Sequence, residues 1–346
     1  ATLTTARAVT LGAAGGTVNT DASTTTTMSG MIMGAGGLTK TGAGALSVTG
    51  VNTYAGATRV GAGTLQADAL NTLSASSAHT VDSGATLALS HDQTIGSLAG
   101  AGAVNLGSAS LTTGGDATST AFSGVMSGTG ELVKTGAGTL TLSGANTYSG
   151  ATHVGAGMLQ ADALNTLSAS SAHTVDNGAT LALSHDQTIG SLAGAGTVNL
   201  DSANLTTGGD ATSTTFSGVM SGSGELIKTG AGTLTLSGAN TYSGGSTLGQ
   251  GRIDVAHNSA LGTGSLALDQ NATLGFAADD LNLANDITLT GVTGAVFDTG
   301  SHDETLSGVI SGAGILSKVG SGSLNLSGAN TYSGATQVSG GTLAIS

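Results

Sequence analysis

The residues that could carry acid–base chemistry are few in this chain of 346 residues. Seven Lys and Arg stand against twenty Asp and Glu, and the formal net charge is −13. The adjacent acidic pairs are Asp279–Asp280 and Asp303–Glu304, and neither has a Lys or Arg nearby in the sequence. General acid–base catalysis needs carboxylates held within reach of the reacting proton and tuned by their neighbours. We therefore interpret both pairs as solvated turns and predict no catalytic residue.

The seven histidines are the next candidates, for a metal site or an activated nucleophile. No H-x-x-x-H or H-E-x-x-H spacing occurs and cysteine is absent, so zinc has weak support. No G-x-S-x-G motif is present, although a Ser-His-Asp arrangement stays open in a chain this rich in serine. We expect solvated loop histidines and no metal. The positions are His79, His91, His153, His173, His185, His257 and His302.

Other ligand classes also have weak support. The glycine-rich strings lack the strand–loop–helix context of a phosphate-binding loop. The calcium-binding nonapeptide is approached only at 114–116 and 208–210, without the tandem repetition that it needs. A net charge of −13 disfavours nucleic acid as a partner. The sequence therefore predicts no cofactor and no nucleic-acid partner.

Every Lys and every Tyr belongs to one repeated motif, which reads G-E-L-V-K-T-G-A-G-T-L-T-L-S-G-A-N-T-Y-S-G-A-T at 130–152. Both series of positions step by 94, 94 and 90 residues. A residue copied into every repeat is usually structural or solvated, and Asn at tight turns caps backbone groups of adjacent coils. We therefore predict a structural motif formed by Lys40, Asn52, Tyr54, Lys134, Asn146, Tyr148, Lys228, Asn240, Tyr242, Lys318, Asn330 and Tyr332.

A duplication accounts for much of the chain. Segment 67–149 aligns without gaps to 161–243, and seven of 83 positions differ. The 94-residue repeats lie at about 67–160 and 161–254, and blocks that carry the motif lie at 28–66, 122–160, 216–254 and 306–346. We expect each 94-residue repeat to span about five coils, so that the same polar patch recurs at two heights ~24 Å apart.

Short β-strands are the elements that must position these residues. Alternation of apolar and polar residues predicts strands at 139–143, 180–184 and 198–200, separated by turns rich in Gly and Asn. Helical periodicity is nowhere sustained. Apolar pairs recur about every 20 residues, which suits one coil of three short strands and their turns.

Composition favours a stacked β architecture. The chain has 60 Gly and no Pro, Cys or Trp, which excludes collagen and disulfides. A charged fraction of 8% with 38% hydrophobic residues argues against disorder, and no stretch approaches the roughly 18 apolar residues of a membrane span. Single coils bury too little to offset the ordering of their backbone, so coils must stack into a shared core. We predict an all-β fold, a single continuous parallel β-helix over 1–346 with about 17–18 coils.

The motif resembles the passenger-associated transport repeat of Gram-negative autotransporters. The likeness is fullest at 130–159 and 314–343, where Val319 stands in for the usual Thr, and the third copy departs from it at 244–253. The resemblance implies a right-handed parallel β-helix that is displayed at the cell surface or secreted. It also implies a C-terminal β-barrel as translocator, which we expect to lie outside this chain and to leave the chain itself not membrane-spanning.

The same resemblance implies a function in adhesion. Passengers of this type act as adhesins and self-associating factors in aggregation and biofilms, with like chains or host surface and matrix as partners. Their motif is linked to export and folding. Two alternatives stay open: a passive stalk, and a carbohydrate-active β-helix enzyme. The near-identical repeats disfavour the enzyme, because catalysis needs one singular site.

Overall fold

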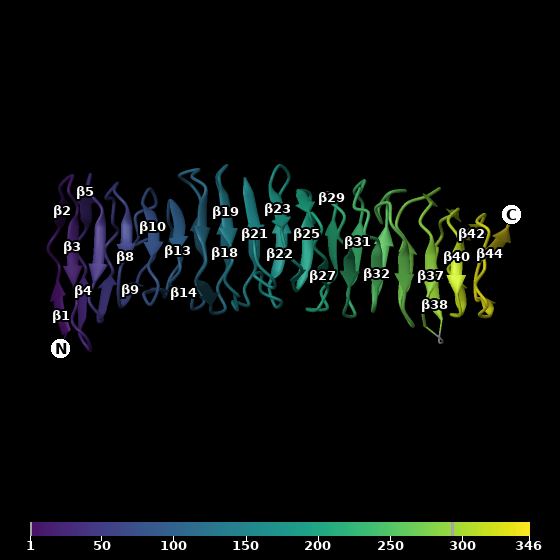
Figure 1. Cartoon of the computed structure of the whole chain (residues 1–346), viewed down its shortest axis with the longest axis horizontal. Helices are drawn as coiled ribbons and strands as arrows, with labels where there is room; N and C mark the ends of the chain where they lie inside the picture. Colours follow the sequence, from purple (N-terminus) through teal and green to yellow (C-terminus); the bar gives the residue numbers. More distant parts are fainter. Residues whose placement is uncertain (1, 292–293) are drawn as a thin grey trace. The chain divides into compact units, whose positions relative to one another are not determined.

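The computed structural model describes residues 2–291 and 294–346. It confirms the predicted fold class, since the chain is an all-β parallel solenoid of about 17 turns, with no helix among these residues (Figure 1). The fold consists of two compact units, residues 1–171 and 172–346. Within the described residues there is no helix that could serve as a membrane span.

In the first unit, successive strands along the chain pass to successive faces of the coil, and each face stacks parallel strands. The first face holds β3 (Gly16–Asn19), β6 (Leu38–Thr41), β8 (Thr58–Val60), β10 (Ala78–Val81), β13 (Ser97–Gly100), β16 (Thr120–Phe122), β19 (Thr139–Leu142) and β21 (Met158–Ala161). The second face holds β1 (Thr2–Thr5), β4 (Thr25–Met28), β7 (Ala45–Val48), β9 (Thr64–Ala67), β11 (Thr86–Leu89), β14 (Ala103–Asn105) and β17 (Val125–Ser127). The third face holds β2 (Val9–Leu11) with β5 (Ile32–Gly34), and separately β12 (Gln93–Thr94), β15 (Leu111–Thr113), β18 (Leu132–Lys134) and β20 (Thr152–Val154).

The second unit repeats this plan of three faces. One face holds β22 (Ala172–Val175), β25 (Ser191–Gly194), β28 (Thr214–Phe216), β31 (Thr233–Leu236), β33 (Arg252–Val255), β35 (Thr273–Phe276), β38 (Ala295–Asp298), β41 (Leu316–Val319) and β43 (Thr336–Val338). Another holds β24 (Gln187–Thr188), β27 (Leu205–Thr207), β30 (Leu226–Lys228), β32 (Ser246–Leu248), β34 (Leu266–Leu268), β37 (Ile287–Leu289) and β40 (Ile310–Gly312). The remaining face holds β23 (Thr180–Leu183), β26 (Thr197–Asn199) and β29 (Val219–Ser221), and separately β36 (Asn282–Leu283), β39 (Glu304–Leu306), β42 (Ser323–Leu326) and β44 (Thr342–Ile345).

The core is built from the apolar residues that alternate along these strands. In β19, Leu140 and Leu142 are buried while Thr139 and Thr141 are only partly so. Leu140 lies between Thr120 of the preceding turn and Leu159 of the next. Strands of three or four residues bury little each, and stacking in register joins their inner faces into one core.

The Asn-Thr-Tyr segments of the motif interrupt the faces. Residues 52–55 and 71–73 occupy the third face of the first unit between β5 and β12, where no strand forms. Thr53 N still donates to Ile32 O and Ala55 N to Gly34 O, both at 2.9 Å, so the turns remain stacked. Each motif copy therefore marks a place where side chains take over part of the hydrogen bonding between turns.

The structure corrects the expected spacing of the repeats. Within the first unit, β6 with Lys40 lies on the first face, whereas β18 with Lys134 lies on the third. The 94 residues between these lysines thus fall one strand short of five whole turns. The cause is the turn length, since Met126 and the residue stacked on it, Asn146, are 20 positions apart and 94 is not a multiple of 20. Matching patches of the first and second motif copies therefore face different sides.

Glycines stack directly above one another at the corners of the coil. A Cβ at Gly124 would lie 1.7 Å from Gly102 O, and one at Gly144 would lie 1.9 Å from Gly124 O. Each of these positions faces the backbone of the preceding turn, which leaves no room for a side chain. The close approach of successive turns therefore requires Gly at these corners.

We expect Gly124→Ala to destabilise the first unit by about 3 kcal/mol, because the added methyl group must push two turns apart. Gly115→Ala is the matched control, since a Cβ there meets nothing within 4 Å. That control should change the free energy of unfolding by less than about 0.5 kcal/mol. Guanidinium denaturation measures both, and equal midpoints for the two variants would contradict the stacking argument.

Candidate functional site

The motif lysines are buried and bind backbone carbonyls. Lys134 is 1% exposed, and its Nζ donates to Thr135 O at 2.7 Å, Gly136 O at 2.9 Å and Ala156 O at 3.2 Å. Lys40 makes the matching bonds to Thr41 O, Gly42 O and Ala62 O at 2.8–3.0 Å. These three acceptors use all three N–H donors of an ammonium group. Each lysine thus joins its own turn of the chain to the next one.

The glycine two residues after each lysine lets the backbone adopt the turn that these hydrogen bonds to the ammonium group require. Gly42 and Gly136 have φ of 77° and 67°, and Gly230 and Gly320 have 66° and 86°. Positive φ turns the preceding carbonyls toward the ammonium group, and only glycine adopts it without strain. Burial lowers the pKa of all four lysines, opposed by Asp116 at Lys134 and by Asp210 at Lys228.

The motif asparagines connect three successive turns. Asn146 is 6% exposed; its Oδ1 accepts from Met126 N at 2.7 Å and its Nδ2 donates to Thr166 O at 2.9 Å. Asn52 bridges Ile32 N and Thr72 O, and Asn240 bridges Met220 N and Ala260 O. Asn330 accepts from Ile310 N at 2.8 Å. The amide replaces the ladder bonds that the interrupted face lacks.

Three of the four motif tyrosines are buried inside the coil, and Tyr332 of the last copy is only partly buried. Tyr54 and Tyr148 are fully buried, and each hydroxyl lies 2.6 Å from the Oγ1 of the threonine four residues later. Burial raises the pKa of both phenols to about 12, opposed by hydrogen bonds from Thr and Ser hydroxyls. Tyr242 bonds Ser246 in the same way, and Tyr332 bonds Thr336 at 2.8 Å. Fully buried phenols of this kind hold the core together and are inaccessible to an external ligand.

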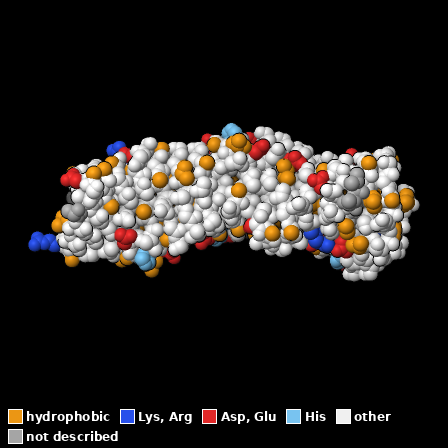
Figure 2. All heavy atoms as spheres, turned by 90° about the horizontal axis from the view of Figure 1, so that it is seen from below, with side chains coloured by type: hydrophobic (Ala, Val, Ile, Leu, Met, Phe, Trp, Pro, Cys, Tyr) orange, Lys and Arg blue, Asp and Glu red, His pale blue; other side chains and the backbone are white. Residues whose placement is uncertain are grey.

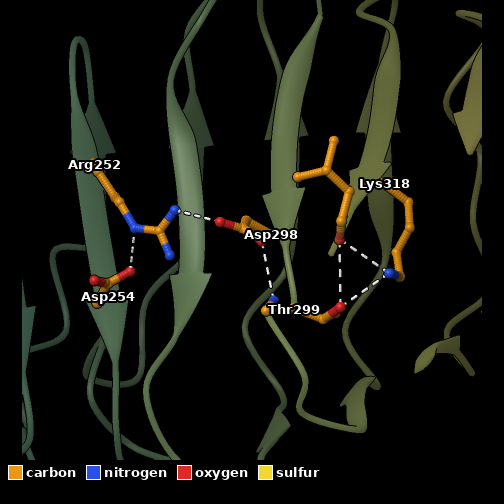
Figure 3. A network of polar contacts seen from close by, with 7 residues as sticks. Arg252, Asp254, Asp298, Thr299 and Lys318 are labelled. Atoms are coloured by element: carbon orange, nitrogen blue, oxygen red, sulfur yellow. Dashed lines mark hydrogen bonds and ion pairs between the residues drawn. The ribbon is translucent and has the colours of Figure 1, made fainter. Parts of the chain in front are cut away.

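The third motif copy keeps its strand ladders despite its altered sequence. β32 pairs with β30 and β34, and β33 pairs with β31 and β35. Arg252, which has no counterpart in the other copies, binds Asp254 Oδ1 at 2.5 Å and Asp298 Oδ2 at 2.6 Å (Figure 3). This guanidinium holds the pKa of Asp298 below its usual value. The contact passes over the intervening strand β35 at Gly275. A Cβ at Gly275 would lie 2.1 Å from the guanidinium, so the side chain of Arg252 needs a glycine there.

The interpretation of all histidines as solvated is wrong for two of them. His79 and His173 lie on β10 and β22 and are each 1% exposed. His79 Nδ1 is 2.9 Å from Ser77 O, and burial lowers the pKa of this imidazole to about 4. Alternation with the buried Val81 could have placed His79 inward from the sequence.

The interpretation of both acidic pairs as solvated turns is wrong for Glu304. Its side chain is 3% exposed, and Oε2 accepts from Leu281 N at 2.7 Å. Burial raises the pKa of this carboxyl to about 7. Period-2 alternation with Leu306 on β39 is the sequence signal that places it inward.

The outer surface offers small polar groups more than charge. Figure 2 shows a face on which the side chains of Lys, Arg, Asp and Glu are few and scattered, and outward strand positions such as Thr141 and Thr215 carry hydroxyls. Among the described residues no group of three or more His, Asp or Glu is placed to hold a metal ion. One hollow of about 830 Å³ lies in the second unit and is lined by residues that include Gln250, Asp269 and Asn271. In this open hollow the Thr290 hydroxyl donates to Asp269 Oδ1, and no Lys, Arg or His is among the described residues that line it.

These features, parallel coils joined by a recurring Lys-Asn-Tyr motif, define the class of protein. The passenger-associated transport repeat family matches residues 38–67, 132–161, 226–255 and 316–345. The adhesin BmaC autotransporter of Brucella suis biovar 1 (strain 1330) is 37% identical over 335 residues, covering 88% of this chain. The chain belongs to the autotransporter passengers that carry this repeat. It spans about 10% of that relative's length, and no solved structure matches it.

We expect Lys134→Met to lower the free energy of unfolding by about 2–3 kcal/mol, because three partly buried carbonyls lose the ammonium donor that joins two turns. Arg59→Met removes a cation whose side chain is 64% exposed and pairs with Asp82 at the surface. That variant should cost less than about 1 kcal/mol. Urea denaturation compares them, and a Lys134 variant as stable as the Arg59 variant would show that this lysine is dispensable.

Proposed function

We propose that this segment is an adhesive part of an autotransporter passenger, displayed on or secreted from a Gram-negative bacterium. The observation that carries the proposal is the 37% identity to an autotransporter adhesin over 88% of the chain. The exposed surface supports it, because charges are sparse on the face that Figure 2 shows and outward strand positions such as Thr141 and Thr215 carry hydroxyls. Such a surface forms many weak hydrogen bonds, and their number compensates for their individual weakness.

The partners we propose are like passenger chains on neighbouring cells, or proteins and glycans of a host surface or matrix. The position of the motif copies on the faces of the first unit limits how such a partner can bind. Its two motif copies lie on different sides, so a single straight partner cannot contact the same patch in both. Each face would then make its own contacts, and a chain could hold partners on more than one side.

The motif itself serves export and folding in this proposal. Lys134 and Asn146 each join successive turns through buried hydrogen bonds. A turn that has just formed therefore presents acceptors and donors that order the next one. Translocation would use the β-barrel of the complete autotransporter.

Display of this segment on non-aggregating Gram-negative cells tests the proposal, with empty display vectors as the control. Settling of the cells indicates self-association, and retention on matrix- or glycan-coated wells indicates a heterotypic partner. Because the net charge is −13, self-association should strengthen with moderate salt and near the isoelectric point of about 4.5. Cells that neither settle nor adhere would leave a passive stalk, and release of oligosaccharides from a matrix glycan would favour an enzyme.

A further inference from the structure

One junction in the second unit, just before the last motif block, carries a buried carboxyl group that the positions matching it before the other three blocks lack. Glu304 begins β39, where the corresponding residues are Thr26, Thr120 and Thr214. Its Oε2 holds the amide of Leu281, the residue directly before β36. Its Oε1 is buried and has no hydrogen-bond partner among the described residues. The carboxyl group of Glu304 thus binds the chain just before β36 through one oxygen, while its other oxygen is buried without a hydrogen bond.

A second contact joins the same two stretches of chain. His302 Nδ1 lies 2.5 Å from Asp279 Oδ1, and the Asp279 side chain is 77% exposed. Asp280 follows with φ of 57°, so the turn before β36 is tightly bent. Residues 279–281 and 302–304 are therefore held together by one carboxyl–amide bond and one histidine–carboxylate pair.

The charges around Glu304 are mostly negative. The turn before β36 contributes Asp279 and Asp280, and its own segment contributes His302 and Asp303. The positive charge of Lys318 on β41 interacts with Asp303. The neighbouring strand β42, which pairs with β39, has no charged residue. Ionised Glu304 would therefore face two aspartates, with His302 as its nearest balancing charge.

Protonation has the same sign at both contacts. Burial raises the pKa of Glu304 to about 7, aided by Asp279 and Asp280 and opposed by Leu281 N–H and His302. The hydrogen bond to Asp279 raises the pKa of His302 above its ordinary value. A group whose pKa is raised on folding stabilises the fold below its unfolded pKa, and that stabilisation is lost as the pH rises through the folded value. The fold therefore gains stability from both groups in acid and loses it above neutral pH, although the Leu281 N–H bond by itself favours the ionised carboxyl.

We propose that Glu304, His302 and Asp279 form a pH-sensitive clasp between residues 279–281 and 302–304. The clasp is closed when Glu304 is neutral and His302 is charged. It opens when both lose their protons, because the buried carboxylate then draws in water and repels Asp279 and Asp280. The device regulates the local order of one turn and does not depend on the adhesive function proposed above.

Hydrogen exchange of the full chain from pH 5.5 to pH 8.5 tests the clasp. Protection factors, corrected for the intrinsic pH dependence of exchange, are followed in peptides that cover 278–284 and 302–308. We expect protection there to fall about tenfold or more across this range. Peptides around Thr214, the matching position in the same unit, should show no such change.

Two variants isolate Glu304. Glu304→Gln keeps an acceptor for Leu281 N–H but cannot ionise, so the Glu304 part of the pH dependence should vanish. Glu304→Thr introduces the residue found at the matching positions. It replaces Glu304→Gln in the experiment if the Gln variant does not fold. His302→Asn should remove the remaining dependence. Flat protection in the parent chain, or an unchanged pH dependence in both Glu304 variants, would overturn the proposal.

Discussion

Leu140→Asp is expected to lower the free energy of unfolding by about 4 kcal/mol or more, the largest effect of any single substitution considered. Leu140 is 2% exposed and stacks between Thr120 and Leu159 inside the first unit. An aspartate there is buried without a cation or a set of donors, so it must either protonate or pull water into the core. Each turn of a solenoid is stabilised mainly by its neighbours, so the damage should spread to the adjoining turns.

Thr141→Asp is the matched control for this prediction. Thr141 lies next in the same strand, points outward and pairs with Ala121 and Gln160. A carboxylate there stays solvated, and the expected change is below about 1 kcal/mol. Guanidinium denaturation and limited proteolysis measure both variants. Equal stabilities would mean that the inward and outward assignments in β19 are wrong.

Asn146→Leu is expected to cost about 3 kcal/mol, because one buried backbone N–H loses its acceptor and one backbone carbonyl keeps only the Asn146 N–H of its two donors. The amide of Met126 would have no acceptor and the carbonyl of Thr166 would lose a donor. Asn105→Leu is the control, since Asn105 is exposed and bonds only the nearby Gly107 N. A parent-like denaturation midpoint for Asn146→Leu would show that water replaces the bridge without loss.

Asn146→Asp separates the two halves of this bridge. The aspartate keeps an acceptor for Met126 N–H but, when ionised, sets a buried negative charge against Thr166 O. Burial should raise the pKa of the new carboxyl, so the variant is destabilised at pH 7 and recovers as the pH falls and the acid gains a proton to donate. Stability that falls further on acidification, relative to the parent chain, would contradict the proposed geometry.

Period-2 alternation was sufficient to predict the solenoid and the inward leucines. The same alternation also places two charged residues inside the coil, which their residue types alone would not suggest. In β18, Lys134 alternates with the buried Leu132, which places a lysine inside the coil, and in β39 the partner of Leu306 is Glu304. For Glu304 the expectation that charged residues are solvated overrode the pattern, while the repeat alone left the lysines as either structural or solvated. The carbonyls that make a buried lysine tolerable come from the next turn, and no local pattern reveals them.

The faces occupied by the motif copies could not be predicted from repeat length alone. Each turn contributes its own number of loop residues, and only their sum decides which face a given residue reaches. A small error in residues per turn accumulates over 94 residues to a whole strand. Contacts such as Arg252 with Asp298, which lie 46 residues apart, depend on the same sum.

A repeat that falls one strand short of five turns has a consequence for how such a chain changes over generations. Unequal crossing-over between near-identical stretches of the gene adds or deletes one copy at a time. Each event would change the length of the passenger. It would also move every surface after the inserted or deleted copy by one face of the coil. Three interchangeable faces, all built from the same short strands, let the core tolerate that phase change. A lineage could thus present old surface chemistry in a new direction without a single point mutation.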